Sequence, residues 1–141
     1  MDFLSALQIS ASGLSVQRTR LQVATANLAN AESTRGPDGL PYRRRDPVVE
    51  AVSFDSFMPG TTGTGAPAAR IASIIEDKSP GKRVYSPGHP DSDGDGFVTL
   101  PNVNPIHEVV NLMSASRGFE ANASAVETLK TMAQRALDIA R

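Results

Sequence analysis

Apolar residues recur at a fixed seven-residue interval along the last third of the chain. This C-terminal series consists of Leu112, Phe119, Val126, Ala133 and Ala140. Three further apolar residues each follow a member of the series by three places: Ala115, Leu129 and Ala136. Such spacing places apolar side chains along one side of a helix, as in a coiled coil. Because Asn is a good N-cap and Pro suits the first helical position, Asn104 and Pro105 set the start of a helix that we predict to run from Pro105 to Arg141.

A second helix is predicted over residues 2 to 30. Its leucine series repeats every seven residues and consists of Leu7, Leu14, Leu21 and Leu28, with Leu4 and Ala11 three places before two of them. Another stripe, Ile9, Val16 and Val23, also repeats every seven residues and lies about 200° around the helix from the leucine series. An ordinary surface helix has one apolar face. Two nearly opposite apolar faces indicate that one partner is not enough for this helix.

The two repeats suggest how the helices pair. We expect the leucine series, centred on Leu14 and Leu21, to pair within the chain with the C-terminal series at Leu112, Phe119 and Val126. The opposite stripe of Ile9, Val16 and Val23 should then meet other subunits. The alternative is a helix sandwiched within one small domain, but a three-layer core is hard to supply in a chain of 141 residues.

The residues between the helices have a different character. Four short apolar runs bounded by Gly, Pro and Asp predict strands at Pro47–Phe54, Arg70–Glu76, Lys82–Tyr85 and Gly96–Leu100. The stretch between Met58 and Ala69 is rich in Pro, Gly, Thr and Ala, and we expect it to be a mobile loop. The predicted class is therefore α+β: paired terminal helices at 1–34 and 104–141, and a small antiparallel β domain at 35–103.

Composition excludes several classes of function. The formal net charge is −1, so nucleic-acid binding has no electrostatic support, and the basic run Arg43-Arg44-Arg45 is interpreted as a solvated face. The chain has no cysteine and therefore no disulfide. No apolar run approaches the roughly 20 residues needed to span a bilayer, so we expect no membrane insertion. The first residues lack a basic region before their apolar positions, so we expect no cleaved secretory signal.

The candidate chemistry is sparse. Residues 91–96 read Asp-Ser-Asp-Gly-Asp-Gly, like the start of a calcium loop, but Asn102 occupies the twelfth position, where a bidentate Glu is required. We therefore interpret this segment as a turn. His89 and His107 have no second His or carboxylate at metal-ligand spacing. We expect no enzyme, no metal and no cofactor. A soluble helical-hairpin binding module or a calcium-binding protein is kept as an alternative function.

Short motifs in both helices resemble signatures of bacterial flagellar rod and hook axial proteins. The N-terminal signature is Ala11-Ser12-Gly13-Leu14, Asn27-Leu28-Ala29-Asn30 and Thr34. The C-terminal signature is the run from Met113 to Asn122, MSASRGFEAN. The middle is similar to the proximal-rod branch, through PYRRR at 41–45, EDKSP at 76–80, VYSPGHP at 84–90 and LPNVN at 100–104. Phe119 stands where the family usually has Tyr. Gly36-Pro37 replaces the Gly-Tyr of distal relatives, which favours the proximal rod.

The resemblance implies a self-assembling subunit of the flagellar drive shaft. Members are exported unfolded by the flagellar type III apparatus and assemble in the periplasm, with the terminal helices forming the inner tube and the β domain facing outward. The implied partners are other rod subunits and the adaptor that joins the rod base to the MS ring. The residues expected at assembly interfaces are Leu7, Ile9, Leu14, Val16, Leu21, Val23, Asn27, Leu28, Asn30, Leu112, Phe119, Asn122, Val126 and Leu129. A cytoplasmic export chaperone is a further alternative, but chaperones of that kind are usually all-helical, and the predicted strands argue against one.

Overall fold

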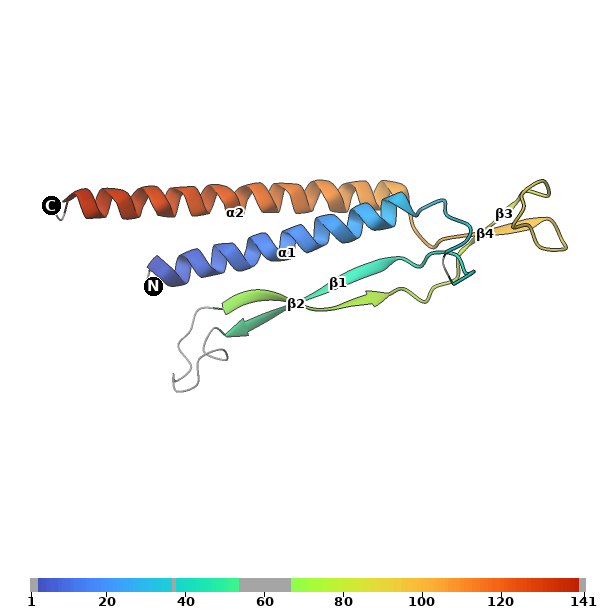
Figure 1. The fold of residues 1–141 in the computed structure, drawn as a ribbon, viewed down its shortest axis with the longest axis horizontal. Coiled ribbons are helices and arrows are strands. Elements are labelled where there is room, and N and C mark those ends of the chain that lie inside the picture. Colours follow the sequence, from blue (N-terminus) through green and yellow to red (C-terminus); the bar gives the residue numbers. More distant parts are fainter. Residues whose placement is uncertain (1–2, 37, 54–66, 140–141) are drawn as a thin grey trace. The chain divides into compact units, whose positions relative to one another are not determined.

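The computed structural model describes residues 3–36, 38–53 and 67–139 (Figure 1). Two long helices, α1 (Phe3–Ala29) and α2 (Pro105–Ile139), enclose four strands in chain order. The strands are β1 (Arg45–Ser53), β2 (Pro67–Glu76), β3 (Lys82–Tyr85) and β4 (Phe97–Leu100). The prediction of an α+β fold with a small β region between two terminal helices is confirmed. None of the described helices is both long enough and apolar enough to cross a membrane.

The strands form two separate two-stranded sheets, β1 with β2 and β3 with β4. All four predicted strands are present. The predicted loop at 58–69 was too long at its C-terminal end, because Pro67, Ala68 and Ala69 already belong to β2. The rest of that loop lies outside the described residues.

The chain divides into two compact units that do not separate helices from strands. Unit 1 comprises Met1–Thr19, Val48–Ser73 and Ser114–Arg141, and unit 2 comprises Arg20–Pro47 and Ile74–Met113. Each helix, and each strand of the β1–β2 sheet, therefore contributes residues to both units.

In unit 1, α1 packs against α2 through small residues. Gly13 lies so close to Asn122 that an added Cβ would be 2.9 Å from its Nδ2, and Gly118 lies equally close to Gln17. Val16 is only 5% exposed, and Ala115 is fully buried. The Ser12 hydroxyl of α1 accepts a hydrogen bond from the Ala69 backbone N–H of β2. Helix α1 therefore contacts both α2 and β2 within this unit.

These contacts correct the predicted faces of α1. Val16 and Val23 are buried within the chain, so the prediction that their face is left for other subunits is wrong for both residues. Leu14 and Leu21 are only half-buried. The physical reason is that Gly13 and Gly118 have no side chain, so the Asn122 and Gln17 side chains of the facing helix can pack directly against them.

In unit 2, β3 and β4 form an antiparallel hairpin in which Lys82 faces Leu100 and Tyr85 faces Phe97. The rings of Tyr85 and Phe97 pack edge to face with centroids 5.3 Å apart. Gly96 precedes β4 with a φ of 80°, a conformation that favours glycine. Val98 is buried at 3% exposure, and it is the apolar core residue of this hairpin.

The start of α2 follows the predicted capping. The Asn104 side-chain oxygen accepts hydrogen bonds from the backbone N–H groups of Ile106 and His107, at 3.1 and 3.5 Å. The Glu108 N–H then donates to the Asn104 carbonyl, which makes the first regular helical turn. Asn104 is therefore the N-cap, as predicted, and this cap places Glu108 at a fixed point of the first turn.

Candidate functional site

Asn27 of α1 is the centre of a buried polar cluster in unit 2. Its side chain is 1% exposed, and its amide nitrogen donates to the Arg45 carbonyl at 2.8 Å and to Glu108 Oε2 at 3.1 Å. Its amide oxygen accepts from the Tyr42 hydroxyl at 2.8 Å and from the Arg45 backbone N–H at 3.0 Å. Both donors and both acceptor positions of this amide are used. One side chain therefore joins α1, the first residue of β1 and Tyr42 just before it, and α2.

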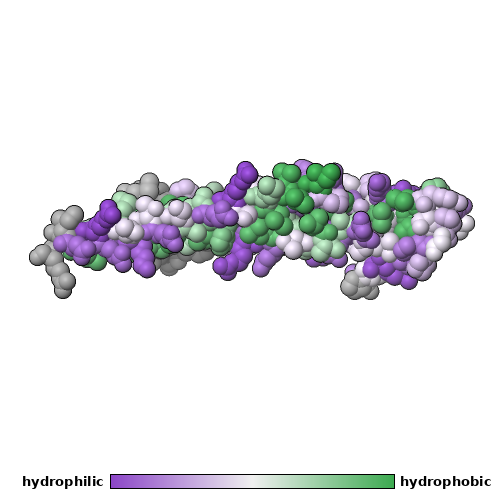
Figure 2. Space-filling model, turned by 90° about the horizontal axis from the view of Figure 1, so that it is seen from above, coloured by the Kyte–Doolittle hydropathy of each residue, from purple (hydrophilic) through white to green (hydrophobic). Residues whose placement is uncertain are grey.

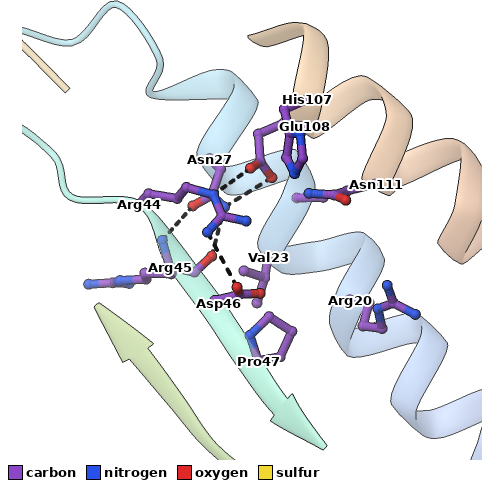
Figure 3. Close-up of a pocket in the computed structure, with 11 residues that line it drawn as sticks. Arg20, Val23, Asn27, Arg44, Arg45, Asp46, Pro47, His107, Glu108 and Asn111 are labelled. Atoms are coloured by element: carbon purple, nitrogen blue, oxygen red, sulfur yellow. Dashed lines mark hydrogen bonds and ion pairs between the residues drawn. The ribbon is translucent and has the colours of Figure 1, made fainter. Parts of the chain in front are cut away.

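Glu108 is the second member of this cluster. It is 1% exposed, and its Oε1 accepts from Arg44 Nε at 2.8 Å while Oε2 accepts from Asn27 (Figure 3). Arg44 also reaches Asp46 at 3.3 Å. We call Asn27, Tyr42, Arg44, Arg45 and Glu108 the polar node. Among the described residues, every buried side-chain nitrogen and oxygen has a hydrogen-bond partner, so the node is fully satisfied.

The electrostatics of the node favour its present protonation states. The hydrogen bond to Glu108 is the main reason that the pKa of Arg44 is raised. The pKa of Tyr42 is also raised, chiefly because burial disfavours the phenolate. Arg45 lies over the Tyr42 ring at 5.7 Å and pairs with Glu76 at 2.9 Å. The Arg44 side chain is 20% exposed and bound to the buried Glu108, so the interpretation of this run as a solvated face is wrong for Arg44, whereas it fits Arg43 and Arg45, which are both exposed.

A pocket of about 260 Å³ opens beside the node. Its lining includes Arg20, Val23, Asp46, His107 and Asn111 (Figure 3). Glu108 is committed to Arg44 and Asn27, so it is not placed as a free general base. Within the described part of the chain, no group of three or more His, Cys, Asp or Glu side chains could hold a metal ion. The pocket is therefore a polar space beside the polar node, and we assign it no catalytic or metal-binding role.

The first turns of α2 carry an exposed apolar surface. Ile106, Val109, Val110 and Met113 are exposed at 77%, 42%, 57% and 50%. Their spacing is that of one helix face. Figure 2 shows hydrophobic side chains gathered on the face that α2 forms. We call these four residues the α2 stripe, and a contiguous exposed apolar patch of this kind is typical of a protein–protein contact.

Asp91 and Asp93 of the calcium-like segment bond to nearby groups of the protein, and Asp93 stabilises a turn. Asp93 accepts from the backbone N–H groups of Phe97 and Asp95 and pairs with Arg83. The hydrogen bond from Phe97 is the main reason that the pKa of Asp93 is lowered. Asp91 accepts from the Thr34 hydroxyl at 2.7 Å and pairs with Arg35. Both carboxylates therefore have partners within the protein.

The structure brings only part of the predicted interface set together. Asn27 and Asn122 lie at contacts between α1 and α2, in units 2 and 1 respectively. Asn30 instead donates to the Ala26 carbonyl of its own helix. The remaining predicted residues, apart from Val16 and Val23, are half-buried: Leu7, Ile9, Leu14, Leu21, Leu28, Leu112, Phe119, Val126 and Leu129.

Sequence reasoning missed Glu108, Arg44 and Tyr42 as members of a site, and it missed the α2 stripe. The signal for the stripe was available, because Ile106, Val109, Val110 and Met113 fall at helical spacing in the sequence. No local signal marks the buried Glu108, whose partners lie 64 and 81 positions away in the chain.

The family models and the full-length relatives that match this chain all belong to flagellar basal-body rod proteins. Residues 7–37 match the family described as "Flagella basal body rod protein", and residues 95–139 match "Flagellar basal body rod FlgEFG protein C-terminal". The flagellar basal-body rod protein FlgC of Salmonella typhimurium is 42% identical over 139 residues, covering 99% of this chain and 98% of that protein. FlgC of Borreliella burgdorferi is 39% identical over 99% of this chain and 98% of its own length. FlgC of Bacillus subtilis is 35% identical over the full length of both chains. This chain therefore belongs to the FlgC family of flagellar basal-body rod proteins.

Proposed function

We propose that this chain, a structural subunit of the flagellar basal-body rod, occupies the proximal rod and joins its neighbours there through the α2 stripe. The observation that carries the proposal is the exposure of Ile106, Val109, Val110 and Met113 on one face of a capped helix. Burying apolar surface stabilises by about 25 cal/mol per Å², so contact with a neighbouring subunit would stabilise the assembled form. The protein acts by being built into a shaft that transmits torque, and we assign it no catalytic role.

The finer features of the proposal rest on the family. We propose that the terminal parts, 1–34 and 104–141, form the inner tube and that residues 35–103 face outward. We further propose export by the flagellar type III apparatus without a cleaved signal peptide, assembly in the periplasm, and contact with other rod subunits and the adaptor at the rod base. The half-buried residues of the leucine series and the C-terminal series are secondary candidates for these contacts.

The experiment compares two valines that differ in burial. Val110→Asp places a charge on the exposed stripe, and Val98→Asp places one in the buried hairpin core. An uncompensated buried charge is costly, so Val98→Asp should lower the melting temperature of the purified protein. Val110→Asp should leave the melting temperature and the amount of secreted protein unchanged, yet give basal bodies without a rod and cells that do not swim.

Normal rods and normal swimming with Val110→Asp would refute the proposed contact. A wild-type melting temperature for Val98→Asp would show that the two residues do not differ in burial as described, and the comparison would lose its control. A rigid soluble monomer whose Val110→Asp variant still supports swimming would favour the alternative of a helical binding module.

A further inference from the structure

Each terminal helix carries one glycine that is followed four places later by an amide side chain. In α1 the pair is Gly13 and Gln17, and in α2 it is Gly118 and Asn122. The pairs face each other within unit 1. A Cβ added to Gly13 would lie 2.9 Å from Asn122 Nδ2, and a Cβ added to Gly118 would lie 2.9 Å from Gln17 Cδ and Nε2.

The contact is therefore reciprocal. The amide side chain of each helix packs against the glycine of the other. The two contacts fit antiparallel helices, because the step from Gly13 up to Gln17 in α1 matches the step from Asn122 down to Gly118 in α2. The Asn122 amide is also held in place, since its Nδ2 donates to the Gly118 carbonyl at 2.9 Å. In unit 2, the hydrogen bond from Asn27 to Glu108 obeys the same antiparallel register.

The apolar repeats do not fix this register. The leucine series and the C-terminal series both have a seven-residue period, so sliding one helix past the other by seven residues would align them again. The glycine–amide contacts would not survive the slide. Gly13 would then face Ala115 or Leu129, and Asn122 would face Ala6 or Arg20, where a side chain occupies the space that Gly13 leaves open.

We propose that Gly13 with Asn122 and Gly118 with Gln17 form a reciprocal interlock that sets the register of the two terminal helices and disfavours a slip by one heptad. The effect is steric, because each amide lies where the facing glycine has no Cβ, and a shifted arrangement would set it against a residue that has one. Gly13 and Gly118 act here as receiving sites, and Gln17 and Asn122 as positioning residues. The proposal concerns the folded subunit and does not depend on its role in the rod.

The test exchanges the members of one contact. Gly13→Asn alone places two amide side chains against each other, and Asn122→Gly alone leaves two glycines facing a gap. The transposed double variant, Gly13→Asn with Asn122→Gly, restores the contact with the amide now on α1 and the glycine on α2. A mismatched double variant, Gly13→Asn with Gln17→Gly, changes as many residues without restoring complementarity. Because Asn has a slightly higher helix propensity than Gly, the Gly13→Asn variant should not lose helix for intrinsic reasons.

The register is read directly as a distance. The chain has no cysteine, so spin labels can be placed at Gln8→Cys and Glu127→Cys, two exposed helix positions in unit 1. A slip by seven residues moves one label by about 10 Å along the helix axis. Pulsed electron spin resonance on the full chain, with circular dichroism to check helix content, measures the label separation in each variant.

The wild type should give one narrow distance. Gly13→Asn and the mismatched double variant should give a second population at a longer distance, because the labels start opposite each other and the slip moves one of them along the axis, or they should lose helix content; the transposed double variant should return to the single wild-type distance. The proposal is overturned if Gly13→Asn keeps the single wild-type distance. It is overturned equally if the transposed variant fails to recover that distance, whether it is slipped or unfolded.

Discussion

Replacing Glu108 with alanine should destabilise the folded subunit more than any other single charge removal on α2. Glu108 and Arg44 lie 2.8 Å apart, with side chains 2% and 20% exposed. Removing one partner of a buried ion pair costs about 3–5 kcal/mol. Arg44 keeps Asp46 and some solvent contact, while one N–H of Asn27 is left without its acceptor. We therefore expect a loss near the lower end of that range, about 3 kcal/mol.

The assay is urea unfolding followed by far-ultraviolet circular dichroism, with the unfolding free energy extrapolated to water. The matched control is Glu127→Ala, which removes an exposed carboxylate from the same helix and should change stability by no more than about 0.5 kcal/mol. Combining Glu108→Ala with Arg44→Ala should cost less than the sum of the two single variants, because they share one contact. A loss below about 1 kcal/mol for Glu108→Ala would show that the Glu108–Arg44 pair contributes no more than an ordinary hydrogen bond.

Three further predictions concern Tyr42, Asp93 and the response to calcium. Tyr42→Phe should cost about 1 kcal/mol in the same urea assay, because it removes the hydroxyl that donates to Asn27 and leaves an acceptor position empty; an unchanged midpoint would contradict this. Because the folded pKa of Asp93 is lowered, its contribution to the β3–β4 hairpin is present above the ordinary aspartate pKa and lost as pH falls through the lowered value. Acid unfolding of the hairpin, followed by NMR, should therefore depend less on pH in Asp93→Asn, and an identical profile would disprove the linkage. Millimolar calcium should not change the melting temperature, because Asp91 and Asp93 already have partners, and tighter binding than about 1 mM would show otherwise.

Local patterns were enough to predict the elements of this fold. The seven-residue repeats predicted both helices, the Asn104–Pro105 pair predicted the start of α2, and the short apolar runs predicted all four strands. These signals lie in neighbouring residues, because helix periodicity, capping and strand propensity are local properties of the chain. The turn interpretation of the aspartate segment rested on the same kind of signal, and Asp93 does bond to the turn.

The contact line between the helices could not be predicted in the same way. Pattern reasoning gives weight to large apolar side chains, so it selected Leu14 and Leu21, whereas Gly13 and Gly118 lie directly against side chains of the facing helix. A glycine in a helix can be a tolerated residue or a contact site, and only the facing residue decides between them. The polar node was missed for a related reason, since the burial of Glu108 depends on residues from two other segments.

We propose that the α2 stripe lies between subunits of the assembled rod, and a photo-crosslinker at Val110 can detect such a contact. The crosslinker would be introduced in place of Val110 in swimming cells, and basal bodies would be purified after irradiation, with the buried Val98 as the control position. We expect a covalent product between this chain and a neighbouring rod subunit from position 110, and none from position 98. Normally assembled rods in which position 110 crosslinks only within its own chain, or not at all, would contradict it.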